Sequence, residues 1–203
     1  GPRGQAKQDE AWAKDRSRGG TTPTPPGLSG YPERPEMILL ANSFFLRNDP
    51  KQLERMKPYP PLATLLVAAA LRERGHEVAL FDATFAAGVD DFIAALEATR
   101  PRVVGILEDN FNYLTKMCTV ATRQATLEMV RAARARGCRV AVNGSDSSDE
   151  PRVYLEAGAH AVLPGEADVS FLSLAEAWGK SADASLAAIP GLVLGGDGGK
   201  LSY

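Results

Sequence analysis

Histidine and cysteine are scarce in this chain of 203 residues, which contains two of each. Cys118 and Cys138 are too few for a disulfide framework or for a zinc or iron–sulfur site with four cysteine ligands. His76 and His160 occur where predicted turns lead into strands, a position typical of structural histidines. We therefore predict no metal site and no catalytic residues within this chain.

Long apolar runs and a strong charge bias are also missing. No stretch reaches the roughly 18 apolar residues of a membrane span, and the N-terminus lacks the order of a secretory signal. The net charge is −2, and no stripe of lysine and arginine alternates with aromatic residues, which argues against nucleic-acid binding. We expect a cytoplasmic protein that binds neither membrane nor nucleic acid.

The common nucleotide-binding motifs are absent as well. After the first predicted strand the chain reads ANSFFLRND (41–49) in place of GxGxxG, and it contains no GxxxxGK[ST]. The glycine-rich GGDGG (195–199) falls between two short apolar runs, as in a hairpin turn. The sequence thus disfavours a dinucleotide or nucleoside triphosphate ligand.

From Met37 onward, short apolar runs alternate with segments of helical spacing. The predicted strands are 37–41, 77–83, 102–108, 138–144 and 160–166, and the predicted helices are 61–75, 89–99, 119–137, 151–158 and 167–179. The basic residues of 119–137 gather near its C-terminal end, where the helix dipole favours them. Continuous apolar strands between helices predict an α/β fold, a Rossmann-like or flavodoxin-like doubly wound, five-stranded parallel sheet.

The composition divides the chain into three parts. Residues 1–35 carry few apolar side chains and are expected to form a disordered tail or to include the remnant of a tag. Residues 36–180 are expected to form the α/β domain, and 181–203 a linker and a C-terminal hairpin extension.

Ligands of open parallel sheets bind at the carboxyl ends of the strands, where the strand order reverses. For the order 2-1-3-4-5, the adjoining loops are 42–61 and 108–118, and both exceed the usual length of such connections. The loops 143–151 and 164–168 share the same edge. Their mixed polar and aromatic content favours an elongated ligand with apolar and hydrogen-bonding surfaces.

The order of motifs resembles that of a known family. The succession is MILLANSFF (37–45), PYPPLATLLVAAALRERGHEVALFDAT (58–84), VVGILEDNF (103–111), NGSDSSDEP (143–151), EAGAHAVLPGEADVSFLSLAEAW (156–178) and IPGLVL (189–194). It resembles the N-terminal cobalamin-binding domain of B12-dependent radical S-adenosylmethionine enzymes, over residues 37–203. The resemblance implies cobalamin as cofactor and a catalytic radical domain in cis or in trans that uses the cobalamin for methyl transfer or related chemistry.

Position by position, the resemblance implies a set of cofactor-binding residues. The corrin ring would be walled by Asn42, Ser43, Tyr59, Pro60, Leu62, Glu108, Asp109, Asn110 and Phe111. The nucleotide tail would run toward Asn143, Gly144 and Ser145, with Gly165 and Glu166 on its other side. The turn NGSDSSDE departs from the GGPHAT type of the family, and DxHxxG is absent, so no histidine is expected on cobalt.

The cluster motif CxxxCxxC is also absent. S-adenosylmethionine and a [4Fe–4S] cluster would therefore belong to a radical domain outside this chain, which by itself would bind the cofactor without generating a radical. Two alternatives are a standalone cobalamin carrier and a ligand-free regulatory domain of the phospho-receiver type. Asp109 suits a receiver, but the acidic pair after the first strand is missing and Pro164 replaces the lysine after the fifth.

Overall fold

The computed structural model describes residues 36–108, 119–180, 186–195 and 201–202. All of them belong to one compact unit, Pro35–Tyr203. The predicted tail 1–35 lies outside the described residues, as do Asp109, Asn110, Phe111 and Cys118. Of the predicted linker and hairpin, residues 181–185, 196–200 and 203 are also outside them.

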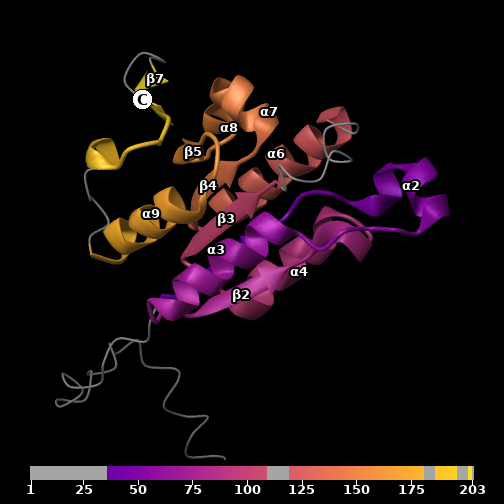
Figure 1. Ribbon diagram of the computed structural model, residues 1–203, viewed down its shortest axis with the longest axis horizontal. Helices are drawn as coiled ribbons and strands as arrows, with labels where there is room; N and C mark the ends of the chain where they lie inside the picture. Colours follow the sequence, from indigo (N-terminus) through magenta and orange to yellow (C-terminus); the bar gives the residue numbers. More distant parts are fainter. Residues whose placement is uncertain (1–35, 109–118, 181–185, 196–200, 203) are drawn as a thin grey trace, which may run out of the picture. The chain divides into compact units, whose positions relative to one another are not determined.

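A five-stranded parallel sheet forms the centre of the unit, in the order β2-β1-β3-β4-β5 (Figure 1). Its strands are β1 Ile38–Ala41, β2 Val78–Phe81, β3 Val103–Leu107, β4 Arg139–Asn143 and β5 Ala161–Leu163. Both the predicted fold class and the predicted strand order are confirmed. The order reverses between β1 and β3, which places the switch point there.

Helices cover both faces of the sheet (Figure 1). α3 (Leu62–Glu73) and α9 (Asp168–Lys180) pack on one face, and α4 (Val89–Thr99) and α6 (Thr119–Ala135) pack on the other. Because neighbouring side chains of a strand point to opposite faces, β3 supplies Leu107 to the first layer and Ile106 to the second. Burial on both sides explains why the central strands read as unbroken apolar runs.

Gly105 in β3 allows the close packing of α9. A Cβ atom at this position would lie 2.5 Å from the Phe171 ring and 2.8 Å from the side chain of Leu40. The fully buried Phe171 ring therefore occupies the space that any larger residue of β3 would need.

Two short helices occur where the sequence predicted only loops. α2 (Pro50–Arg55) lies within 42–61, where the Asp49 side chain accepts hydrogen bonds from the backbone of Lys51 and Gln52 and Pro50 takes the first helical position. After β4, α7 (Ser145–Asp149) precedes α8 (Pro151–Glu156). The remaining 3-10 turns are η2 (Leu46–Asn48), η3 (Ala83–Phe85) and η4 (Leu186–Ala188).

The C-terminal extension begins against the sheet. The backbone N–H of Val162 donates to Val193 at 2.9 Å, and the N–H of Val193 donates to Val162 at 2.8 Å. Beyond this bridge, β6 (Leu194–Gly195) pairs antiparallel with β7 (Leu201–Ser202), as the predicted hairpin requires.

His160 and Trp178 pack together near the start of β5. Their ring centroids are 5.9 Å apart in an edge-to-face arrangement, and His160 Nδ1 accepts a hydrogen bond from the backbone of Val140. Burial, reinforced by the positive charge of Arg134, lowers the pKa of His160. This neutral, packed ring fits the structural role predicted for it.

Among the described helices, none has the length and apolar character of a membrane span.

Candidate functional site

The strand register brings the carboxyl ends of four strands to one edge, called here the carboxyl edge. Ala41 of β1 lies beside Ile106 of β3, and Asn143 of β4 lies between Leu107 and Leu163. The segments that follow these strands therefore start side by side. The four predicted loops, 42–61, 108–118, 143–151 and 164–168, therefore each have their first described residue at this edge, as the sequence indicated.

Asn143 joins the turns after β4 and β5. Its buried side-chain amide donates to the backbone oxygen of Leu163 at 2.7 Å and to that of Gly165 at 2.8 Å. These two hydrogen bonds hold the predicted residue Gly165 beside the end of β4. Asn143 thus shapes the edge through the backbone of its neighbour.

A cavity of about 280 Å³ lies at this edge, between the beginnings of α3 and α9. Three predicted site residues line it, namely Asn143, Gly165 and Glu166. The other lining residues are Ala63, Leu66, Val67, Ala167 and Asp168. The sequence analysis did not indicate these five, although their place at or near the beginnings of the two helices that meet this edge was the available signal. The cavity is mainly apolar and has carboxylates at Glu166 and Asp168.

Beside the cavity, the start of α3 exposes several apolar side chains. Tyr59 is 58% exposed, Leu62 46% and Leu66 51%, and Pro60 between them is also exposed. Large apolar side chains gathered in this way are typical of a ligand-binding or partner-binding surface.

Asn42 and Ser43 follow β1 and differ in their hydrogen bonding: the side chain of Asn42 has partners, and that of Ser43 has none in the described part of the chain. The Asn42 side chain donates to Asp82 at 2.9 Å and accepts from the backbone N–H of Ala83 at 2.7 Å, so it fixes the turn after β2. Ser43 is 1% exposed, and its Oγ has no hydrogen-bond partner in the described part of the chain. A buried, unpaired hydroxyl can donate to a ligand or to water.

Glu108 is a buried carboxyl group at the end of β3. It is 6% exposed, and burial, reinforced by the charge of Asp146 and opposed by that of Arg123, raises its pKa to about 7. Its side chain lies over Gly144, where a Cβ atom would approach the Glu108 carboxyl carbon within 2.6 Å. Glycine at 144 is what lets this carboxyl group approach the turn after β4.

Near Glu108, the side chains of Arg123, Asp146 and Tyr154 form a polar network. Both oxygens of Asp146 accept from Arg123, at 2.7 Å from Nε and 2.5 Å from the terminal nitrogen, and Tyr154 also donates to Asp146. Burial opposes the charge of Asp146, but the hydrogen bonds from Arg123 and Tyr154 lower its pKa. Burial and the same carboxylate raise the pKa of Tyr154. Ser145, also predicted, adjoins this network and is partly buried.

This arrangement suits binding. Within the described ranges, no group of three or more histidine, cysteine, aspartate and glutamate side chains is placed to hold a metal ion. What the edge offers is an apolar cavity, an exposed apolar surface, an unpaired hydroxyl and turns that bring the backbone close. Such a set fits a large ligand with apolar and polar parts.

Comparison with solved structures finds proteins that share this fold. A structure of the cobalamin-dependent S-adenosylmethionine radical enzyme OxsB with aqua-cobalamin and S-adenosylmethionine bound matches with a TM-score of 0.63 and 17% identity over 84% of this chain. The structure of apo, selenomethionine-labelled OxsB matches with a TM-score of 0.61 and 16% identity over the same share. This chain spans 22% of the OxsB chain in both. At these identities, the similarity demonstrates a shared fold.

No curated protein sequence matches the chain. A family model described as the B12 binding domain does match, over residues 54–175. This stretch contains the cavity-lining residues, the Glu108 carboxyl and the turn after β4. The match extends over more than half of the 203 residues, and the protein therefore belongs to the B12-binding domain family.

Proposed function

We propose that this protein binds cobalamin at the carboxyl edge of its sheet. The observation that carries the proposal is the cavity between α3 and α9, which lies at the strand ends and is lined by Asn143, Gly165 and Glu166. The resemblance assigned these three positions to the cofactor, and all of them fall within the stretch matched by the family model.

The described residues fit the chemistry of cobalamin, which combines a broad macrocycle, amide side chains and a nucleotide tail. Tyr59, Leu62 and Leu66 offer exposed apolar surface suited to the corrin. The unpaired Ser43 hydroxyl offers a donor for an amide oxygen. The cavity of about 280 Å³ accommodates part of the ligand, and Gly165 at its rim lets the ligand approach the backbone.

The assignment of individual contacts forms part of the proposal. In it, the corrin is walled by Asn42, Ser43, Tyr59, Pro60, Leu62 and Glu108, together with Asp109, Asn110 and Phe111, and the tail approaches Asn143, Gly144, Ser145, Gly165 and Glu166. Asn42 and Asn143 act by holding backbone in place, because their amides already bond Asp82 and Gly165. Neither His76, which precedes β2, nor His160, which precedes β5, belongs to the carboxyl edge, so we expect no histidine of this chain on cobalt.

We further propose that this domain, residues 36–180, serves a B12-dependent radical S-adenosylmethionine enzyme. The fold shared with OxsB supports this, since that radical enzyme has been solved with both aqua-cobalamin and S-adenosylmethionine bound. Bound cobalamin would supply a methyl carrier, and this chain would hold and orient it. S-adenosylmethionine and the [4Fe–4S] cluster would belong to a cytoplasmic catalytic domain in cis or in trans, toward which residues 181–203 lead.

Cobalamin binding can be tested by gel filtration. The purified chain is mixed with hydroxocobalamin, and the protein peak should retain visible absorption in a ratio of one cobalamin per chain. Leu66→Glu places a charge on the cavity wall and should reduce the retained cobalamin at least about tenfold, since burying an unpaired carboxylate is unfavourable.

Leu65→Glu is the matched control. Leu65 is 40% exposed on the same helix but does not line the cavity, so this variant should bind like the unmodified chain. A colourless protein peak for the unmodified chain refutes the proposed function. Equal loss in both variants would refute the assigned cavity.

A further inference from the structure

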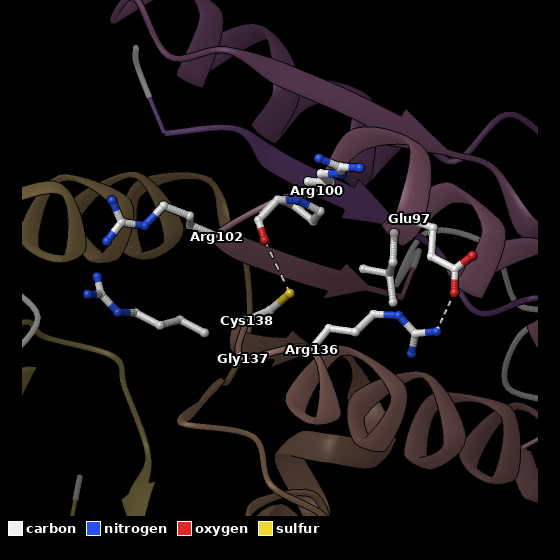
Figure 2. Close-up of a pocket in the computed structure, with 9 residues that line it drawn as sticks. Glu97, Arg100, Arg102, Arg136, Gly137 and Cys138 are labelled. Atoms are coloured by element: carbon white, nitrogen blue, oxygen red, sulfur yellow. Dashed lines mark hydrogen bonds and ion pairs between the residues drawn. The ribbon is translucent and has the colours of Figure 1, made fainter. Parts of the chain in front are cut away.

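A second, larger cavity of about 680 Å³ lies at the opposite edge of the sheet, where the strands begin. It is lined by two turns, one leading from α4 into β3 and the other from α6 into β4 (Figure 2). Four of its nine lining residues are arginines, namely Arg100, Arg102, Arg136 and Arg139. We call this the amino-edge pocket, and nothing in the cobalamin proposal uses it.

The backbone explains why the arginines gather. Arg100 ends α4 in the left-handed conformation, with φ of 48°, and Gly137 follows α6 with φ of 78°. β3 and β4 are neighbours in the sheet, and the N–H of Arg139 donates to the backbone oxygen of Arg102 at 2.8 Å. The two turns therefore lie side by side, and the basic residues of both face one cavity.

The positive charge of the pocket is only partly balanced. Arg136 pairs with Glu97 at 2.7 Å, and Arg102 pairs with Glu36 at 2.7 Å. Arg139 donates to a neutral group, the backbone oxygen of Trp178, at 2.6 Å. Within the described ranges, neither Arg100 nor Arg139 forms an ion pair with a carboxylate.

Cys138, which lies near the centre of Figure 2, contributes no negative charge to the amino-edge pocket. Its thiol donates to the backbone oxygen of Pro101 at 3.2 Å (Figure 2), and burial raises its pKa. The group therefore stays neutral and forms part of the pocket wall. Among the described residues, the lining of the pocket thus carries four guanidinium groups and one carboxylate, that of Glu97.

The guanidinium groups are spread across the cavity rather than focused on one point. In Figure 2, Arg102 lies on one side of Cys138 and Arg136 on the other, and Arg100 lies above them in the view. A single small anion would meet one or two of them, whereas an extended anion can reach several. Arginine also presents paired N–H donors that match the oxygens of a phosphate group.

We propose that the amino-edge pocket binds a small polyanion of the polyphosphate class, with two or more linked phosphate groups. The ligand completes the charge balance of Arg100 and Arg139 and shares the N–H groups of Arg102 and Arg136 that their carboxylate partners leave free. This site shares no lining residue with the cavity at the carboxyl edge, so polyphosphate binding can be tested separately from cobalamin binding.

Isothermal titration calorimetry of the full chain tests the proposal, with tripolyphosphate, pyrophosphate, orthophosphate and sulfate at constant ionic strength. We expect one saturable site whose affinity falls in that order from tripolyphosphate to the single anions and weakens as salt is added. An absence of saturable binding, or equal affinity for all four anions, would overturn the proposal.

Two variants with opposite expected effects identify the site. Arg100→Gln with Arg139→Gln should weaken tripolyphosphate binding at least about tenfold, since two partly exposed charges are lost. Glu97→Gln should strengthen it several-fold, because it frees Arg136 from its partner. Arg152→Gln on α8 is the control, since Arg152 is exposed and does not line the pocket.

The two variants also separate a folding defect from a binding defect. Thermal unfolding without ligand reports whether the double variant is folded. If the double variant fails to fold, Glu97→Gln still tests the assigned site. An unchanged or weaker affinity of Glu97→Gln for tripolyphosphate would contradict the assignment. The assignment would also be contradicted if a folded double variant bound tripolyphosphate as the unmodified chain does, or if Arg152→Gln lost as much affinity as the double variant.

Discussion

Replacing Glu108 with glutamine should stabilise the protein in a way that depends on pH. Glu108 is 6% exposed, and its carboxyl group makes no hydrogen bond within the described part of the chain. Ionising it inside the fold is therefore unfavourable, and a neutral amide of nearly the same shape avoids that penalty.

The size of the effect follows from the pKa. Burial, with the charge of Asp146, raises the pKa of Glu108 from its usual 4.5 to about 7. Each unit of pKa corresponds to about 1.4 kcal/mol, so the folded state loses roughly 3 kcal/mol relative to the unfolded state once the carboxyl is ionised. Below pH 4.5 the group is protonated in both states and the loss is absent. Between pH 4.5 and 7 the folded state binds more protons, so stability falls as pH rises.

Urea unfolding at pH 5 and pH 8 measures this difference. At pH 8, Glu108→Gln should raise the free energy of unfolding by up to about 3 kcal/mol, and at pH 5 the gain should fall below about 1 kcal/mol. Leu65→Gln, a change at an exposed position of α3 that removes no titratable group, should show no such dependence on pH. If the effect of Glu108→Gln is the same at both pH values, the carboxyl titrates normally and the reasoning is refuted.

Two further substitutions test the packing and the polar network. Gly105→Ala should lower the free energy of unfolding by about 1–3 kcal/mol in urea titrations, because its Cβ would lie 2.5 Å from the Phe171 ring, and wild-type stability would show that α9 shifts freely. Asp146→Asn should cost about 1–3 kcal/mol at pH 7 by removing the carboxylate that Arg123 and Tyr154 bond. Because these bonds lower the pKa of Asp146, the deficit should shrink as acid protonates the wild type, and a deficit that grows in acid would contradict the network.

The sequence predicted the sheet well because burial on both faces leaves a simple pattern. Runs such as 103–107 are apolar throughout, and their spacing between helices fixes parallel pairing with few alternatives. The short helices α2 and α7 escaped prediction, since six and five residues hold too little periodicity. For α2 a local signal existed, namely Asp49 as cap followed by Pro50.

The residues that line the two edges of the sheet were predictable to different degrees. The ends of the predicted strands indicated the loops that contain Asn143, Gly165 and Glu166, and the resemblance named these residues individually; the structure places them together at one cavity. Arg123 and Asp146 pair across 23 positions through side-chain geometry, which no local pattern reveals. Of the arginines of the amino-edge pocket, only Arg136 lies in the predicted helix 119–137, whose basic residues were interpreted as favourable charges at a helix end. The sequence did not indicate that the four converge, because this depends on β3 and β4 being neighbours.

The packing of Trp178 equips the folded domain with an optical reporter. The chain has two tryptophans, and Trp178 is 3% exposed, so the emission of this indole should be blue-shifted in the folded state and move to longer wavelength on unfolding. Its backbone oxygen accepts from Arg139 at the amino-edge pocket, and its helix begins beside the cavity at the carboxyl edge. With Trp12 replaced by phenylalanine, a single fluorophore would follow events at both ends of the sheet.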